Sequence, residues 1–396
     1  MTPQPDTKPW LEFPGNSPST FALPDYHSVY FSYGFDWIKN KTLGLRITGD
    51  FGHARYMSYN IYGEVLGTSL CARKDVEIQA LPLNVNPFLP GISPDATNRR
   101  YRVHVFCSDT ASPTKTQGWE NPITFPTLTK TGGAALLAVI LRYYLPAGDN
   151  RAGVHLPIIE AFDTKDGCPL KLPPNLVPET MPKHLYEEKM APIWGTIVDN
   201  TLRFYHTPGG GEFNNKDNLY LLNAVRKQPD EVVLLKFLAP TYGHDNAQYP
   251  NADVRYWAFN QGNADTSTPI GMPDQQFYPA MDGFTYIAMG DPAIADWAQR
   301  GGYNFMPWMA ATSEPAVILY RNLVTRATPK FAGDITKVPQ SDFAQVPITG
   351  SNDPRITSLD AKNYIYNYAP TGKKVTQAEF MRNYGGMPSP GFKVSG

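Results

Sequence analysis

A nine-residue stretch occurs twice in this chain, in two related forms. Residues 53–61 read HARYMSYNI and residues 253–261 read DVRYWAFNQ, 200 positions later. Each copy places Arg-Tyr at the start of an alternating, aromatic-rich run, which is typical of a β-strand with two different faces. We therefore interpret the pair as the mark of an internally duplicated β protein.

Two further pairs of segments repeat in the same order. Residues 103–109 match residues 285–291 at an offset of 182, and the run AVIL occurs at 138–141 and again at 316–319, at an offset of 178. The offsets fall along the chain, as expected if the second copy has shorter loops. Two long units are too few for a solenoid, so the repeats predict a tandem duplication.

The composition favours strands over helices. Charged residues make up only 18% of the 396 residues, aromatic residues reach 13%, and there are 38 Pro and 32 Gly. Such a composition is typical of many short strands joined by loops rich in turn residues. We predict an all-β protein of two tandem jelly-roll-like β-sandwich domains with a short C-terminal helix.

The expected parts follow one another along the chain. They are an N-terminal arm (1–20), a first sandwich (21–162), a Pro-rich connector (163–192), a second sandwich (193–340) and a C-terminal tail (341–396). In the first sandwich we expect a central strand over Ala134–Leu145, apolar throughout, and a short strand over Val76–Ala80.

The only helix predicted with clear signals lies in the tail. Thr376 and Glu379 have the spacing of a capping box, which predicts a helix over Gln377–Tyr384. Gly385 then fits a left-handed C-cap.

Charge and patterning exclude several classes of partner. The formal net charge is -1 and no basic run stands out, so we expect no nucleic acid. The longest uncharged apolar run, residues 132–141, is too short to span a bilayer, so we expect no membrane partner. No signal peptide is visible, which predicts a cytoplasmic protein, or an exported one if a leader was removed. The sequence leaves open whether the chain forms a homodimer.

Several runs of the sequence resemble those of known proteins. In the second half these are EVVLLKFLAP, NADVRYWAFN, YIAMGDP, NFMPWM and AVILYRNLV, and in the first half HARYMSYNIYG and LAVILRYYLP. They resemble the largely uncharacterised relatives of the domains of unknown function numbered 1254 and 1214, over most of residues 40–340. The resemblance implies jelly-roll-like sandwiches, and many of these relatives are exported. It implies no catalytic residues.

No cofactor or metal signature is present. The seven histidines never come closer than 22 residues in sequence, and the three cysteines have no metal or redox spacing. An odd cysteine count without a CxxC motif suits buried thiols in a reducing compartment. A metal site assembled from His53, His104 and an acid is the alternative to our expectation of no metal and no cofactor.

The arginines are the most informative candidates for a site. Arg55 and Arg255 open the two repeated strands, and each has an acid nearby, Asp50 and Asp253. A structural Arg–Asp pair within each copy is the simpler interpretation.

The sharper interpretation is a pocket for an anionic or carbonyl-bearing ligand. Its catalytic residues would be Arg255, Tyr256 and Arg321, and its substrate-binding residues would be Trp257, Asn260, Trp308 and Tyr320. Alignment of the AVIL runs sets Arg142 opposite Tyr320, which predicts that Arg142 and Arg321 point to opposite faces and that at most one serves a common pocket.

Two hypotheses for function follow. The first is a small-molecule-binding protein that is a cofactor-independent enzyme of specialised metabolism, of isomerase, cyclase or lyase type. The second is a non-catalytic binding or assembly protein whose aromatic residues form core and interface. We expect the pocket in or beside the second sandwich, with loops from the first closing over it.

Overall fold

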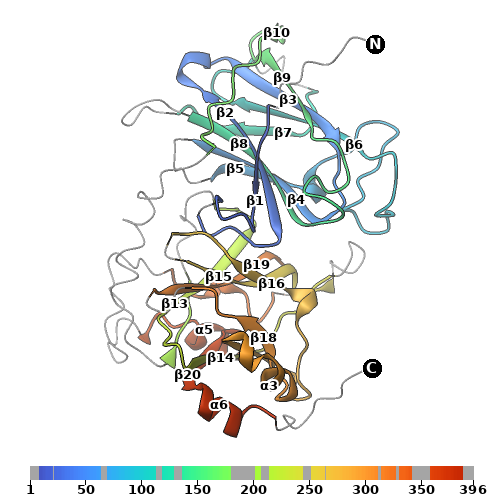
Figure 1. Cartoon of the computed structure of the whole chain (residues 1–396). Helices are drawn as coiled ribbons and strands as arrows, with labels where there is room; N and C mark the ends of the chain where they lie inside the picture. Colours follow the sequence, from blue (N-terminus) through green and yellow to red (C-terminus); the bar gives the residue numbers. More distant parts are fainter. Residues whose placement is uncertain are drawn as a thin grey trace.

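The computed structural model shows two β-sandwiches, the first above the second in Figure 1. It describes residues 9–20, 22–63, 69–112, 118–128, 136–179, 201–206, 214–243, 251–263, 265–310, 314–326, 330–340 and 357–386. The all-β fold and the tandem sandwiches predicted from the sequence are confirmed.

Each sandwich pairs an inner sheet, which faces the other sandwich, with an outer sheet. In the first sandwich the inner sheet has the order β1 (Leu11–Pro14), β2 (Ser28–Asp36), β8 (Leu136–Pro146), β4 (Ala54–Gly63), β5 (Ser69–Lys74). The outer sheet has the order β10 (Pro169–Leu170), β9 (Ile158–Asp163), β3 (Leu43–Asp50), β6 (Arg100–Cys107), β7 (Pro122–Phe125).

The second sandwich repeats this plan. Its inner sheet has the order β12 (Tyr205–His206), β13 (Asn218–Val225), β19 (Ala316–Thr325), β15 (Val254–Gly262), β16 (Ile270–Pro273). Its outer sheet has the order β11 (Thr201–Leu202), β20 (Thr371–Thr376), β14 (Glu231–Phe237), β17 (Thr285–Gly290), β18 (Asn304–Pro307). Even the parallel edge pair recurs, as β6–β7 in one copy and β17–β18 in the other. The duplication is therefore visible in three dimensions.

The short helices lie outside the sheets. Among the described residues, the α-helices are α3 (Ala295–Arg300), α5 (Lys362–Ile365) and α6 (Gln377–Asn383). The 3-10 helices in the same part of the chain are η1 (Ile38–Asn40), η2 (Asp75–Glu77), η4 (Asp274–Gln276), η5 (Pro292–Ile294), η6 (Ile335–Lys337) and η7 (Tyr366–Tyr368). In the described part of the chain, no helix is both long enough and apolar enough to span a membrane.

The outer faces of the two inner sheets pack against each other, so the molecule has four layers of sheet. A buried cluster at this junction takes Tyr56 and Tyr144 from the first sandwich and Tyr256, Ala258 and Leu323 from the second. Each inner sheet is thus buried on both faces, and every residue of β2 and β15 is buried. This burial explains why the repeated stretches are rich in aromatic residues on both faces of the strand.

Some boundaries differ from those expected. Strand β20, which takes the place of β9 in the first sandwich, comes from the segment predicted as a tail. The strand expected over Val76–Ala80 is not present: Val76 and Glu77 lie in the 3-10 helix η2, where Ile78 N donates to the Asp75 carbonyl oxygen at 3.0 Å, and Ala80 forms an isolated bridge with Tyr101. The predicted helix is present as α6, with the Thr376 hydroxyl accepting from Glu379 N at 3.1 Å. The left-handed residue after it is Gly386 and not Gly385.

The segment predicted as a connector runs along the first sandwich as far as the structure describes it. The Tyr33 hydroxyl donates to the Pro173 carbonyl at 2.8 Å, and the Asn175 amide donates to Ser32 O at 3.0 Å. Residues 180–192 of the predicted connector lie outside the described residues.

Candidate functional site

The two repeated strands, β4 and β15, cross where the sandwiches meet. The Arg255 Nε atom donates to the Arg55 carbonyl oxygen at 2.8 Å, and the Arg55 Nη1 atom lies 3.5 Å from the Arg255 carbonyl oxygen. Residues at the same position of the two copies therefore contact each other, across an approximate two-fold axis.

The two arginines are neutralised by carboxylates of the opposite sandwich. Arg255 Nη1 lies 2.5 Å from Asp75 Oδ1, and Arg55 Nη1 lies 3.2 Å from Asp274 Oδ2. Each carboxylate also accepts from the backbone of its own sandwich, Asp75 from Met57 N at 2.7 Å and Asp274 from Trp257 N at 3.2 Å. These hydrogen bonds orient the two carboxylates within their own sandwiches.

The Arg–Asp pairing was predicted correctly in kind, but its partners were wrong. Asp253, expected to pair with Arg255, instead binds Arg326 at 3.0 Å. The reason is geometric, because Arg255 points out of its own sandwich and toward the neighbouring one. Sequence proximity could not show that the acids come from the other copy.

The tyrosines that follow these arginines also bind carboxylates of the opposite sandwich. The Tyr56 hydroxyl donates to Asp217 at 2.6 Å, and the Tyr256 hydroxyl donates to Asp25 at 2.9 Å. Burial and the adjacent carboxylate raise the pKa of both phenols well above the ordinary value. Both hydroxyls therefore stay protonated at neutral pH and act as structural donors.

Arg142 and Arg321 occupy equivalent positions, which corrects the alignment of the AVIL runs. Arg142 pairs across the ladder with Ser58, and Arg321 pairs with Ala258, so the true offset is 179. Both guanidinium groups therefore leave the inner sheets on the same side. Arg142 lies 5.0 Å from the Tyr30 ring centroid, and Arg321 lies 5.4 Å from that of Tyr220. The prediction of opposite faces was wrong by one residue of register.

The seven predicted site residues do not meet in one pocket. Arg255, Tyr256 and Arg321 lie between the sandwiches with side chains at most 3% exposed. Asn260 lies on the same face, and its Oδ1 atom accepts from Tyr26 N at 2.9 Å.

The remaining three lie elsewhere. Trp257 and Tyr320 belong to the core inside the second sandwich, where Trp257 stacks on Phe277 and Tyr320 on Phe259. Trp308 follows β18 and packs on the edge of that core, 5.8 Å from Lys227 Nζ. The alternation along β15 was predicted correctly, and this alternation is what separates the residues.

The histidines proposed as an alternative metal site are engaged otherwise. His104 contacts the Glu120 carbonyl oxygen through Nδ1 at 2.9 Å and Arg46 through Nε2 at 3.3 Å, and His53 contacts Arg99. Burial lowers the pKa of both imidazoles. Among the described residues no group of three potential ligands is placed to hold a metal ion.

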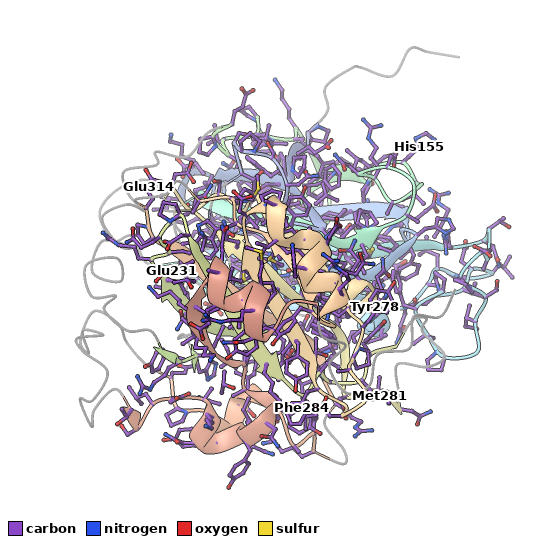
Figure 2. All side chains as sticks on the ribbon, turned by 60° about the horizontal axis from the view of Figure 1, so that its bottom comes forward. His155, Glu231, Tyr278, Met281, Phe284 and Glu314 are labelled. Carbon is purple, nitrogen blue, oxygen red and sulfur yellow. The ribbon has the colours of Figure 1, made fainter. Side chains whose placement is uncertain are left out.

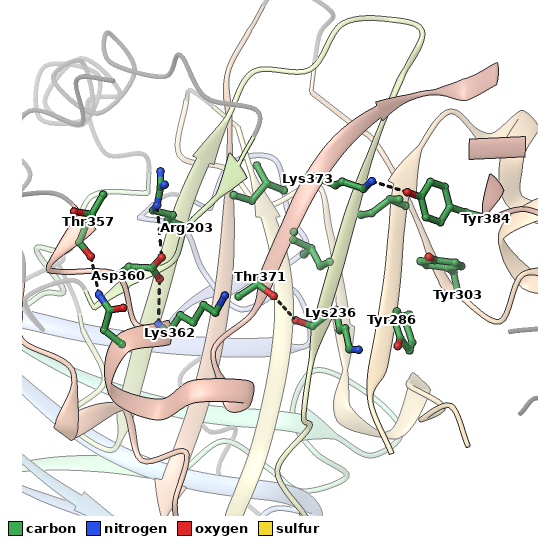
Figure 3. A pocket seen from close by; sticks show the side chains of 15 residues that line it. Arg203, Lys236, Tyr286, Tyr303, Thr357, Asp360, Lys362, Thr371, Lys373 and Tyr384 are labelled. Atoms are coloured by element: carbon green, nitrogen blue, oxygen red, sulfur yellow. Dashed lines mark hydrogen bonds and ion pairs between the residues drawn. The ribbon is translucent and has the colours of Figure 1, made fainter. Parts of the chain in front are cut away.

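An open groove of about 610 Å³ lies on the far side of the second sandwich, on the outer sheet (Figure 3). Its described lining residues are Leu202, Arg203, Leu234, Leu235, Lys236, Tyr286, Tyr303, Thr357, Asp360, Lys362, Asn363, Thr371, Gly372, Lys373 and Tyr384. All of them belong to the second sandwich and its C-terminal segment. The groove is thus in the sandwich where a pocket was expected, but loops from the first contribute none of these residues.

The floor of the groove is formed by neighbouring strands. Lys236 of β14 pairs with Thr371 of β20, and Lys373 pairs with Leu234, so the two lysines are diagonal neighbours on one face. The Lys236 Nζ atom lies 3.9 Å from the Phe284 ring centroid and 5.2 Å from that of Tyr286.

The two walls differ in character. On one side the rings of Tyr286, Tyr303 and Tyr384 stand in a row (Figure 3). On the other side Asp360 lies 3.7 Å from Arg203 Nε and accepts from Lys362 N at 3.1 Å. Burial raises the pKa of Asp360 above its usual value, although Arg203 opposes this.

An exposed apolar loop adjoins the groove. Tyr278 and Met281, 66% and 70% exposed, lie between β16 and β17, beside Phe284 (Figure 2). Phe284 in turn contacts Lys236 at the floor of the groove.

The groove could not be predicted from the sequence, because the segments that form it carry only weak patterns. Eight of its described lining residues lie between Thr357 and Tyr384, in α5, β20 and the segments beside them, a region expected to be loop-like apart from the helix predicted over Gln377–Tyr384. The alternation in residues 371–376, TGKKVT, is too short and too polar to stand out as a strand. Lys236 is the one charged residue in the apolar run VVLLKFLAP, and this was a visible signal of a strand with an exposed position.

Comparison with known proteins supports the fold and gives no information about the chemistry. No protein-family model matches the chain, and no curated protein matches it. A crystal structure of an uncharacterised protein from Burkholderia cenocepacia is similar, with a TM-score of 0.54 at 12% identity over 93% of this chain and 81% of that one. A protein from Vibrio parahaemolyticus gives a TM-score of 0.42 at 10% identity, over 79% of this chain and 88% of that one. The resemblance to the relatives of domains 1254 and 1214 stays a prediction.

Proposed function

We propose that this chain is a small-molecule-binding protein and that its ligand site is the groove on the outer sheet of the second sandwich. The observation that carries the proposal is the groove itself. Its volume of about 610 Å³ is within the range of ligand sites, and side chains able to donate, accept and stack line its floor and both walls.

The groove is a better candidate for the ligand site than the three residues that were expected from the sequence to be catalytic. Arg255, Tyr256 and Arg321 are sealed between the sandwiches and already hold carboxylates or carbonyl groups. A substrate would have to separate the two inner sheets to reach them. The groove, in contrast, is open without any movement of the sheets.

A blocking substitution tests the location of the site. Thr371 lines the groove between its two walls (Figure 3), so Thr371→Trp should fill it and abolish binding of any ligand that sits there. Thr97→Trp is the matched control, because Thr97 is exposed on a loop of the first sandwich. Ligands would first be identified by native mass spectrometry of the purified protein and by a thermal-shift screen of small organic molecules.

The expected result is that a ligand raises the melting temperature of the wild type and of Thr97→Trp but not of Thr371→Trp. Far-ultraviolet circular dichroism of both variants shows whether the fold is retained. If a ligand stabilises a folded Thr371→Trp variant as much as the wild type, its site is elsewhere and the proposal is wrong.

A further inference from the structure

The charges that line the groove restrict the chemistry of its ligand. Four described lining residues are cationic, Arg203, Lys236, Lys362 and Lys373, and one is acidic, Asp360. Asp282 lies just outside, 3.9 Å from Lys236 Nζ. Counting both acids, the groove carries 4 − 2 = 2 positive charges, on a chain whose net charge is -1. The groove is therefore a local concentration of positive charge on an otherwise balanced chain.

The cations are distributed along the groove and do not form one cluster. Lys236 and Lys373 stand on the floor, whereas Arg203 and Lys362 lie on the wall beyond Thr371 (Figure 3). A ligand with a single negative charge could meet only one of these groups of cations. A ligand with several negative charges at intervals could meet both.

The two lysines on the floor can exchange their present partners for an anionic group of a ligand. Lys236 and Asp282 have side chains 43% and 45% exposed, and an ion pair of this kind contributes only about 0–1 kcal/mol. Lys373 donates to the Tyr384 hydroxyl at 2.5 Å, a neutral acceptor that a carboxylate would replace favourably. An anionic group between the two lysines would gain charge-assisted hydrogen bonds at little cost.

The remaining lining residues indicate which class of molecule carries the negative charges of the ligand. Tyr286, Tyr303 and Tyr384 bring aromatic carbon and phenol groups to one wall, where the C–H groups of puckered, hydroxylated sugar rings can pack, while Thr357, Asp360 and Asn363 offer donors and acceptors on the opposite wall. An enclosed, mainly apolar pocket would instead suit an apolar or aromatic molecule. The open, polar and aromatic groove suits a short sugar chain.

From these observations we infer that the ligand is an acidic oligosaccharide, with its sugar rings along Tyr286, Tyr303 and Tyr384 and its carboxylates at the lysines. This inference rests on the proposed function, since it names the ligand class of the same groove. It adds the prediction that charge, and not only shape, selects the ligand.

The probe for this inference is a short oligogalacturonate, compared with a neutral malto-oligosaccharide of equal length by isothermal titration calorimetry. The wild type should bind the acidic chain and show no measurable heat with the neutral one. Raising the salt concentration should weaken binding, because the lysines are exposed and their attraction is screened.

Two single substitutions measure the role of charge. Lys236→Met and Lys373→Met should each weaken binding of the oligogalacturonate about tenfold, since each removes one charge-assisted contact. Lys39→Met is the matched control, because Lys39 is an exposed lysine of the first sandwich that pairs with Asp36. It should leave the affinity unchanged.

The outcomes separate this inference from the proposed function. Equal binding of the acidic and neutral chains, or full binding by both lysine variants, overturns the acidic class while leaving a sugar-binding groove. If neither sugar binds but another molecule binds and is lost in Thr371→Trp, the saccharide inference is wrong and the groove stands. If oligogalacturonate binds Thr371→Trp normally, both proposals fail.

Discussion

Arg255 of the second sandwich is neutralised by Asp75 of the first, with 2.5 Å between Nη1 and Oδ1 and side-chain exposures of 1% and 0%. An ion pair this deeply buried is not by itself stabilising, because both groups lose their hydration. Removing one partner alone is costly, because the other partner stays buried without its counter-charge. Substitutions in this pair therefore test whether the junction between the sandwiches is sealed.

Arg255→Met should lower the free energy of unfolding by about 3–5 kcal/mol, because it leaves the Asp75 carboxylate buried without its counter-charge. The double variant Arg255→Met/Asp75→Asn should recover part of this loss. Denaturant titrations followed by tryptophan fluorescence measure both.

The control for this cycle is Arg326→Met, since Arg326 and Asp253 form a pair within the second sandwich with side chains 25% and 17% exposed. It should cost about 1 kcal/mol or less. A loss at Arg255 as small as that at Arg326 would contradict a sealed junction.

Asp274 should make the stability depend on pH between about 4 and 6. Burial raises its pKa to about 6, above the ordinary 3.8, although Arg55 opposes the shift. The folded state therefore holds more protons than the unfolded state in this window, and the contribution of Asp274 to the free energy of unfolding falls as the pH rises through it.

The measurement is the free energy of unfolding of the wild type and of Asp274→Asn at several pH values. The difference, wild type minus variant, should decrease from pH 4 to pH 6 and then level off. A difference that increases with pH would show that the ion pair with Arg55 outweighs burial.

Gly372 should be intolerant of any side chain. A Cβ atom added there would lie 2.0 Å from the Leu234 carbonyl oxygen of the neighbouring strand. Gly372→Ala should therefore push β20 away from β14 and lower the free energy of unfolding by about 1–3 kcal/mol.

The adjacent Lys373→Ala is the control, because its exposed side chain should change stability by no more than about 0.5 kcal/mol. The melting temperatures of the two variants, each compared with that of the wild type, test this prediction. Equal melting temperatures would mean that β20 moves aside without cost.

The three cysteines should react with a thiol reagent at very different rates. Cys168 is exposed and Cys107 is buried, while burial raises the pKa of Cys71 to about 12. Because the thiolate is the reactive form, one thiol per native chain should react quickly with Ellman's reagent and the other two only on unfolding. Cys168→Ser should abolish the fast reaction, and a fast phase that persists in this variant would contradict the assignment.

The strand pattern could be predicted from the sequence because it depends on local alternation and burial. The repeated stretches become β4 and β15, and residues 136–145 of the apolar run belong to β8, which lies between β2 and β4. The duplication was visible for the same reason, since both copies place equivalent residues on equivalent faces.

The candidate site was harder to predict, because it depends on which faces meet. Tyr256 and Trp257 are neighbours in sequence, yet one lies between the sandwiches and the other inside one of them. Nothing local indicates that Asp75 belongs with Arg255, or that residues 371–376 complete a sheet with β14. Both facts depend on contacts between distant segments.

The exchange of partners across the junction has a consequence for the history of the chain. Residue i of one half contacts residue j of the other, and j contacts i, which is the isologous arrangement found at the two-fold axis of a dimer of identical subunits. Duplication and fusion of one such subunit would account for this symmetry within a single polypeptide. Such an origin would require only the shared interface to stay alike, and the groove lies outside that interface, on an outer sheet.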